Sequence, residues 1–209
     1  MTRFLPSPRR VAAPARFRTV GLRFGRMALG MALVLAPAVA PAQAEVQKIM
    51  LLCGGTQQLC PWFRAGVEPP EGWVEDRASG QRNEIVVLLP AGTTLDDADR
   101  WAYARAVYNP ERMALDRVVA GDIERLKAES PGLAVTPQVD RTGPGGRIVK
   151  VYDLAEDQDG TAVAERVATF DDTDKDGNAF TVSLTVAIQG EDRRGEAVAL
   201  LDRLIESYR

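Results

Sequence analysis

The chain has 209 residues, 45% of them hydrophobic and 26% charged, with a formal net charge of −3 at pH 7. It contains no histidine and two cysteines. The lack of histidine excludes Ser-His-Asp and Cys-His catalysis and zinc sites built on histidine ligands.

Residues 1–44 have the pattern of a secretory signal peptide. Seven arginines precede the apolar run 27–42, no acidic residue occurs before Glu45, and the segment ends in Ala-Gln-Ala. The apolar run contains two prolines and is shorter than the roughly 20 residues that a membrane span needs. We predict cleavage after Ala44, export to the bacterial periplasm or the medium, and no stable membrane anchor afterwards. The arginines are Arg3, Arg9, Arg10, Arg16, Arg18, Arg23 and Arg26.

A lipid-modified cysteine is the alternative form of export. Cys53 follows the apolar residues 49–52. Such a site needs a small residue before the cysteine, whereas Leu52 is large and Lys48 interrupts the apolar run. We therefore discount a lipoprotein.

Residues 45–209 are predicted to form one domain, because 165 of the 209 residues remain after cleavage and suit a single core. Seven of the 26 basic residues and none of the 29 acidic residues lie in the leader, so 19 basic and 29 acidic residues remain, a net charge of −10. Such a surface repels nucleic acid and anionic membranes and favours cations as ligands.

Cys53 and Cys60 lie close together in CGGTQQLC. In an exported protein, two neighbouring cysteines most simply form one disulfide. Redox catalysis is the alternative, but it normally uses the C-x-x-C spacing. We predict a structural disulfide between Cys53 and Cys60.

The first half of the domain is predicted to contain three strands. Residues 46–53 are a short apolar stretch, 83–92 form a buried strand that stops at Pro90, and 100–110 alternate in polarity. Residues 61–76, with three prolines and two tryptophans, indicate an irregular or hairpin segment.

A helix is predicted from Asn109 and Pro110 to Glu129. Asn109 can cap a helix and proline suits its first position. Apolar side chains recur on one face of this segment at helical spacing. They are Leu115, Val118, Val119, Ile123 and Leu126.

A second run of strands is predicted at 133–139, 147–155, 161–170 and 179–188, with a turn at 143–146. The last strand alternates most regularly, which predicts one face on a core and the other on water or a polar layer. Its apolar face is Phe180, Val182, Leu184, Val186 and Ile188, and its polar face is Thr181, Ser183, Thr185 and Gln189.

The chain closes with an amphipathic helix over 191–209. Sequential strands with tight turns pair antiparallel and helices cover the sheet. We predict an α+β sandwich, an antiparallel sheet with two packed helices. The apolar face of the closing helix is Ala197, Leu200, Leu201, Leu204, Ile205 and Tyr208.

Three segments resemble the PsbP/Mog1/DcrB-like fold: PPEGWVED at 69–76, the hairpin at 167–186 and the closing helix at 197–208. The resemblance implies an antiparallel sheet with packed helices. It also implies a protein that binds other proteins and lacks catalytic machinery, since that fold hosts photosystem II accessory proteins, a partner of Ran and bacterial envelope proteins.

Two groups of aromatic residues are candidates for a partner-binding patch. Tyr103, Arg105 and Tyr108 lie close together in one predicted strand, and Tyr, Trp and Arg are common anchors of interfaces. The second group of candidates for such a patch is Trp62, Phe63 and Trp73. For both groups we favour structural packing.

The segment DDTDKDGNAF at 171–180 contains the first half of a calcium loop. Asp172, Asp174, Asp176 and Asn178 match early ligand positions of an EF-hand, but Ser183 occupies the place of the final glutamate. The residues Asp, Gly and Asn are also those that a tight hairpin turn requires. We predict a hairpin turn and retain weak calcium binding as an alternative.

We therefore predict an exported, non-enzymatic envelope protein that acts through a protein partner and carries no resident cofactor. The alternatives are a calcium-binding envelope protein and a hydrolase that uses carboxylates alone, which would need two such groups about 5–9 Å apart in a cleft.

Overall fold

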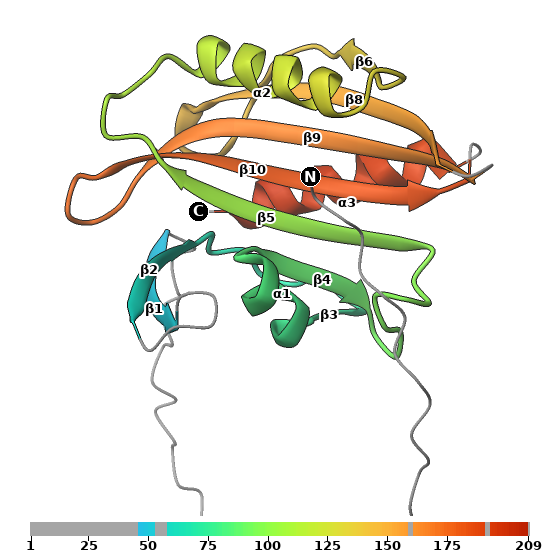
Figure 1. The fold of residues 1–209 in the computed structure, drawn as a ribbon, viewed down its shortest axis with the longest axis horizontal. Helices are drawn as coiled ribbons and strands as arrows, with labels where there is room; N and C mark the ends of the chain where they lie inside the picture. Colours follow the sequence, from blue (N-terminus) through green and yellow to red (C-terminus); the bar gives the residue numbers. More distant parts are fainter. Residues whose placement is uncertain (1–45, 53–57, 159–160, 191–192, 209) are drawn as a thin grey trace, which may run out of the picture. The chain divides into compact units, whose positions relative to one another are not determined.

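The computed structural model describes residues 46–52, 58–158, 161–190 and 193–208 (Figure 1). The predicted signal peptide and Cys53 lie outside the described residues. The cleavage site and the disulfide with Cys60 therefore stay predictions.

The fold is an α+β sandwich built on one antiparallel sheet, as predicted. The strand order is β3-β4-β5-β10-β9-β8-β6, the short strand β7 pairs with β8, and β1 and β2 form a separate two-stranded sheet. The strands are β1 Gln47–Leu52, β2 Leu59–Arg64, β3 Trp73–Glu75, β4 Val86–Pro90, β5 Arg100–Tyr108, β6 Ala134–Pro137, β7 Arg141–Thr142, β8 Ile148–Gln158, β9 Thr161–Thr173 and β10 Ala179–Gln189.

The two long helices lie on opposite faces of the sheet (Figure 1). Helix α3, Arg194–Ser207, contributes five buried apolar residues to the main core. Helix α2, Leu115–Glu129, places its apolar side chains against Tyr152, Leu154 and Val167 on the other face. The buried face of α3 is the one predicted, and three residues of the predicted α2 face, Val119, Ile123 and Leu126, pack on the sheet. The buried residues of α3 are Ala197, Leu200, Leu201, Leu204 and Ile205.

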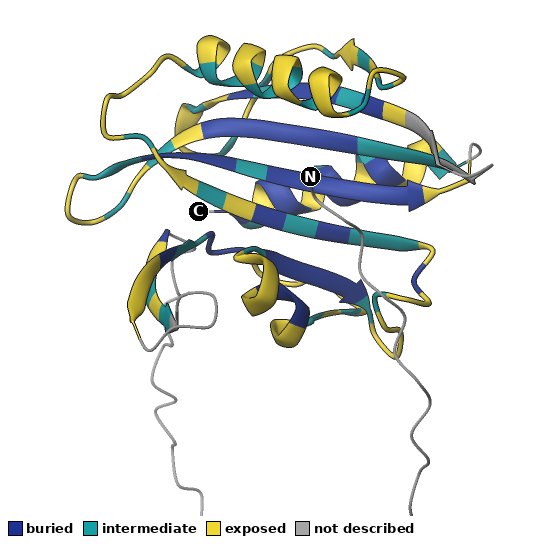
Figure 2. Ribbon diagram, in the orientation of Figure 1, coloured by how far each residue is buried: buried dark blue, intermediate teal, exposed yellow. Residues whose placement is uncertain are grey.

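Strand β10 is buried on both of its faces (Figure 2). Its alternate apolar side chains belong to the main core with α3. On the other face, Thr181 is 4% and Thr185 is 2% exposed. The polar face predicted from the alternation therefore lies in a polar layer, where the hydroxyls of Thr169 and Ser183 lie 3.3 Å apart.

Strands β9 and β10 pair antiparallel from Ala179↔Thr173 to Gln189↔Val163. The acidic segment is thus the hairpin turn that the sequence predicts. Gly177 has a φ of 81°, a backbone conformation that glycine adopts without steric cost.

The middle helix begins later than predicted. It starts at Leu115, not at Pro110, and its cap residue Ala114 makes no side-chain capping hydrogen bond. Arg112 has a φ of 49°, which is not a helical value and prevents the helix from extending back to Pro110. Asn109 instead closes a turn, accepting a hydrogen bond from the backbone N–H of Met113.

A third, short helix was not predicted. Helix α1, Arg77–Asn83, begins at Asp76, whose carboxylate accepts the backbone N–H of Ser79 at 3.1 Å. Its sequence RASGQRN has no apolar periodicity, so no helical pattern was visible. Strands β2 and β3 likewise occur within the segment 61–76 that was predicted as irregular or hairpin.

Candidate functional site

A groove runs along one edge of the sheet, beside the second half of β5. Strand β4 pairs with β5 over three residues, from Leu88↔Ala102 to Val86↔Ala104. Beyond Ala104, the hairpin β1–β2 lies near β5 but does not pair with it among the described residues. A space of about 490 Å³ remains between them, within the size range of ligand pockets. Its lining residues are Pro61, Trp62, Phe63, Asn83, Glu84, Ile85, Tyr103, Arg105, Ala106, Val107 and Tyr108.

Part of the backbone of β5 points toward this groove without a paired strand among the described residues. The backbone N–H of Asn109 donates to Ala179 of β10, and strand residues alternate in the direction of their N–H and C=O groups. The backbone groups of Ala106 and Tyr108 therefore point away from β10. Within the described residues, no strand pairs with β5 beyond Ala104 on this side.

The hairpin β1–β2 is fixed at the groove by its aromatic residues. Trp62 is 7% exposed and donates its indole N–H to the backbone oxygen of Glu84 at 2.7 Å. The ring of Phe63 lies 4.9 Å from that of Phe180 and 5.6 Å from that of Tyr108. These contacts hold one wall of the groove and confirm the structural reading of Trp62 and Phe63.

Apolar side chains are exposed at the groove and on the adjoining hairpin. Val107 is 44% and Tyr108 45% exposed, while Met50 and Leu59 of the hairpin are 48% and 60% exposed. Single exposed apolar residues are ordinary, but Val107 and Tyr108 are neighbours that line the groove, which is typical of a contact surface.

The predicted group of Tyr103, Arg105 and Tyr108 is divided by the sheet. Tyr103 donates to Glu165 at 3.1 Å, and burial together with that carboxylate raises the pKa of Tyr103. Arg105 is exposed. Tyr108 packs with Phe63 and Phe180. Tyr103 is therefore structural, whereas Arg105 and Tyr108 are available at the surface. Trp73 packs against the main core.

The oxygens of the acidic turn are engaged within the protein. Asp172 accepts from the Tyr208 hydroxyl and lies 3.6 Å from the Arg147 guanidinium. Asp174 accepts the backbone N–H groups of Asp176 and Asn178 and the side-chain amide of Asn178, which lowers the pKa of Asp174.

The structure does not bring the four predicted calcium ligands together. No group of three or more His, Cys, Asp or Glu side chains suited to a metal ion occurs in the described part of the chain. Calcium binding by Asp172, Asp174, Asp176 and Asn178 stays a prediction.

The architecture defines the class of the molecule as an antiparallel α+β sandwich. No family model matches the sequence, and no curated protein sequence matches it. Among solved structures, the fold is similar to that of LpqN, a protein involved in cell envelope biogenesis of Mycobacterium tuberculosis. The TM-score is 0.50 at 11% identity, with 77% of this chain and 88% of LpqN covered.

At this identity the likeness concerns the fold alone. It supports an α+β fold that is also found in an envelope protein, whereas the closer assignment to PsbP and Mog1 is not confirmed by the comparisons. Across the described residues, no helix is long and apolar enough to cross a membrane.

The open edge of β5 is the feature that sequence reasoning missed. The alternating pattern predicted the strand, but nothing in it shows where the neighbouring strand ends. The one local signal is the exposed pair Val107 and Tyr108, which continue β5 beyond its partner β4.

Proposed function

We propose that this chain is an exported, non-enzymatic envelope protein that binds an extended segment of a protein partner along β5. The observation that carries the proposal is the open edge at Ala106 and Tyr108 beside a groove of about 490 Å³. An extended peptide supplies a row of N–H and C=O groups that pairs with such an edge.

The groove also suits the side chains of such a segment. Alternate residues of an added strand point to opposite faces. Those on one side would meet Phe63 and Tyr108, and those on the other would meet Val107. Exposed aromatic and apolar residues provide the buried contacts from which interfaces gain most of their affinity.

Two further observations agree with this proposal, the first by excluding histidine-based catalysis and the second by agreeing with an envelope role. The chain has no histidine, and the fold resembles that of a protein involved in envelope biogenesis. The acidic surface predicted for residues 45–209 favours partners with basic segments, because opposite charge accelerates encounter.

The test uses a displayed library of random twelve-residue peptides selected on the purified protein. Selected peptides are measured by calorimetry, and amide hydrogen exchange is followed at Ala106 and Tyr108. We expect both amides to become protected on binding, since they would donate to the added strand.

Two substitutions probe the edge. Ala106→Pro removes a donor that points away from β10, a position at which an edge strand tolerates proline. Val107→Asp places a charge in the contact. Each should weaken peptide binding by roughly tenfold or more. Val139→Asp is the matched control, because Val139 is 85% exposed and lies outside the groove. Selected peptides that bind all three variants equally, without protection of β5, would refute the proposal.

A further inference from the structure

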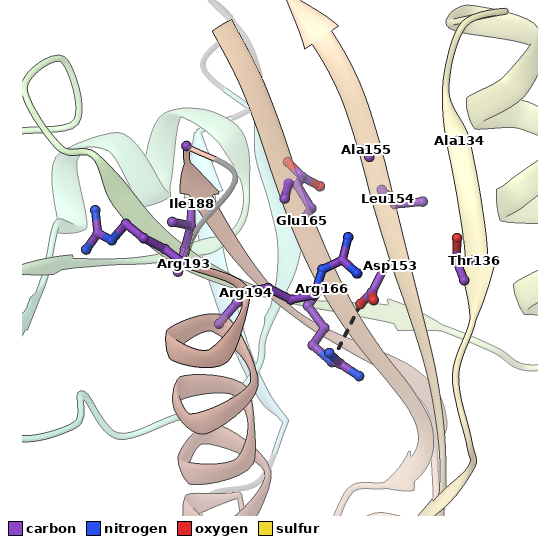
Figure 3. Close-up of a pocket in the computed structure, with 13 residues that line it drawn as sticks. Ala134, Thr136, Asp153, Leu154, Ala155, Glu165, Arg166, Ile188, Arg193 and Arg194 are labelled. Atoms are coloured by element: carbon purple, nitrogen blue, oxygen red, sulfur yellow. Dashed lines mark ion pairs between the residues drawn. The ribbon is translucent and has the colours of Figure 1, made fainter.

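A second pocket lies between β6, β8, β9 and the first turn of α3 (Figure 3). Its cavity volume is about 50 Å³. On this measure one water needs about 10–15 Å³, so the pocket has room for a small group such as a carboxylate or phosphate. It is separate from the groove beside β5.

A buried arginine faces this pocket. Arg166 is 8% exposed, and its Nε has no hydrogen-bond partner among the described residues. Asp153 Oδ1 lies 3.6 Å from this nitrogen, which is an ion pair without a hydrogen bond. Asp153 Oδ1 is also without a hydrogen-bond partner, and its other oxygen accepts from Gln138 at 3.0 Å. A buried N–H group without a hydrogen bond lowers the stability of the fold unless another group accepts from it.

A second arginine joins it from the start of α3. Arg194 extends toward Arg166 and Asp153, whereas Arg193 points away from them (Figure 3). Arg193 is paired with Asp99 and Glu196. Arg194 is exposed, and among the described residues its guanidinium makes no hydrogen bond or ion pair.

The helix adds backbone donors at the same place. α3 has 14 residues, and its cap residue makes no side-chain hydrogen bond to the first-turn N–H groups. The N–H groups of a helix's first turn and the helix dipole favour an anion. Glu196, the acidic residue of this turn, is paired with Arg193. The lining carboxylate of Glu165 is directed to the opposite face of β9, where it accepts from Tyr103. Among the described lining residues, Asp153 is thus the carboxylate on the face of Arg166, and Arg166 balances its charge.

We propose that this pocket binds an oxyanion group, a carboxylate or a phosphate, between Arg166, Arg194 and the first turn of α3. Arginine forks match the geometry of both groups. The site is independent of the groove beside β5, and its small volume means that only the charged end of a ligand enters it.

The test is a titration of the ¹⁵N-labelled protein with sodium phosphate and, separately, sodium acetate, at constant ionic strength. The readout is the Nε–Hε NMR signal of Arg166. We expect a saturable shift with at least one anion, and the anion that acts shows whether phosphate or carboxylate is preferred. The absence of a saturable shift with both anions would overturn the proposal.

The variant Arg194→Gln should weaken the binding by roughly tenfold or more, since a charge-assisted hydrogen bond is lost. Arg203→Gln is the matched control, because Arg203 is an exposed arginine on the same helix that does not line the pocket. Substitution of buried Arg166 would leave Asp153 unpaired and endanger folding, so it is not used. Equal binding by the Arg194→Gln and Arg203→Gln variants would likewise overturn the proposal.

Discussion

The hydroxyl of Tyr208 donates a hydrogen bond of 2.6 Å to the carboxylate of Asp172. This contact ties the C-terminal end of α3 to the end of β9. Arg147 also packs at this contact, since its guanidinium lies 5.3 Å from the ring centres of both Phe170 and Tyr208. Asp172, the first of the four predicted calcium ligands, therefore has a structural role.

Tyr208→Phe should lower the free energy of unfolding by about 1.5–3 kcal/mol, the typical range for a hydrogen bond to a charged group. Phenylalanine keeps the ring contact with Phe170, whose centroid lies 4.9 Å away, so the loss reports the hydroxyl alone. Urea denaturation measures it. Ser207→Ala is the neighbouring control, and equal effects of the two substitutions would contradict the role of the Asp172 contact.

Calcium should give no saturable heat below about 1 mM in calorimetry, even though weak extracellular sites bind in the range of about 10⁻⁴–10⁻³ M. The reason is that Asp172 and Asp174 already accept hydrogen bonds within the protein. A saturable heat that disappears in the variant Asp174→Ala/Asp176→Ala would instead establish the calcium site.

Gly80→Ala should destabilise the protein by about 1–3 kcal/mol, the usual cost of overpacking. A Cβ at this position would lie 2.6 Å from the backbone oxygen of Ile85, and a backbone atom cannot move aside as a flexible side chain can. This close approach is what lets α1 pack on β4.

Gly121→Ala in α2 is the matched comparison, because a Cβ there meets nothing within 4 Å. It should stabilise by up to about 1 kcal/mol through helix propensity. Thermal unfolding of both variants measures the contrast. Destabilisation by both substitutions would show that α2 is not helical at Gly121.

Asp76→Ala should cost about 1 kcal/mol at pH 7, since Asp76 caps α1. Its hydrogen bonds from Ser79 lower the pKa of Asp76. A lowered pKa in the folded state means that this stabilisation is complete above the unfolded value of about 3.9 and is lost as pH falls through the folded value.

The difference between the wild-type protein and the Asp76→Ala variant should therefore shrink in acid, which urea denaturation across pH 2–7 can follow. Carbon NMR of the Asp76 carboxyl group gives the folded pKa directly. Asp96→Ala, at an exposed position, serves as the control. A difference that stays constant down to pH 2 would contradict the capping role.

The α+β class, the β9–β10 hairpin and the buried face of α3 were predictable from the sequence. Their patterns are local, and each side chain faces the core according to the period of its own element. Helix α1 was not predictable, because its residues are polar and its formation depends on the cap at Asp76 and on packing of Gly80 against β4.

Neither the groove beside β5 nor the pocket at Arg166 could be predicted from the sequence. The sequence by itself determined the strongly periodic elements, β4, β5, β8, β9, β10 and α3, because hydrophobic periodicity is a property of consecutive residues. Only the tertiary structure decided that β4 begins at Val86, beside Ala104, so that no described strand pairs with Ala106 on this side. It also decided that Arg194 and Arg166 line the same pocket (Figure 3). The physical reason is that both features depend on which elements become neighbours and where each one stops, and strand pairing and helix packing fix these only when the chain folds.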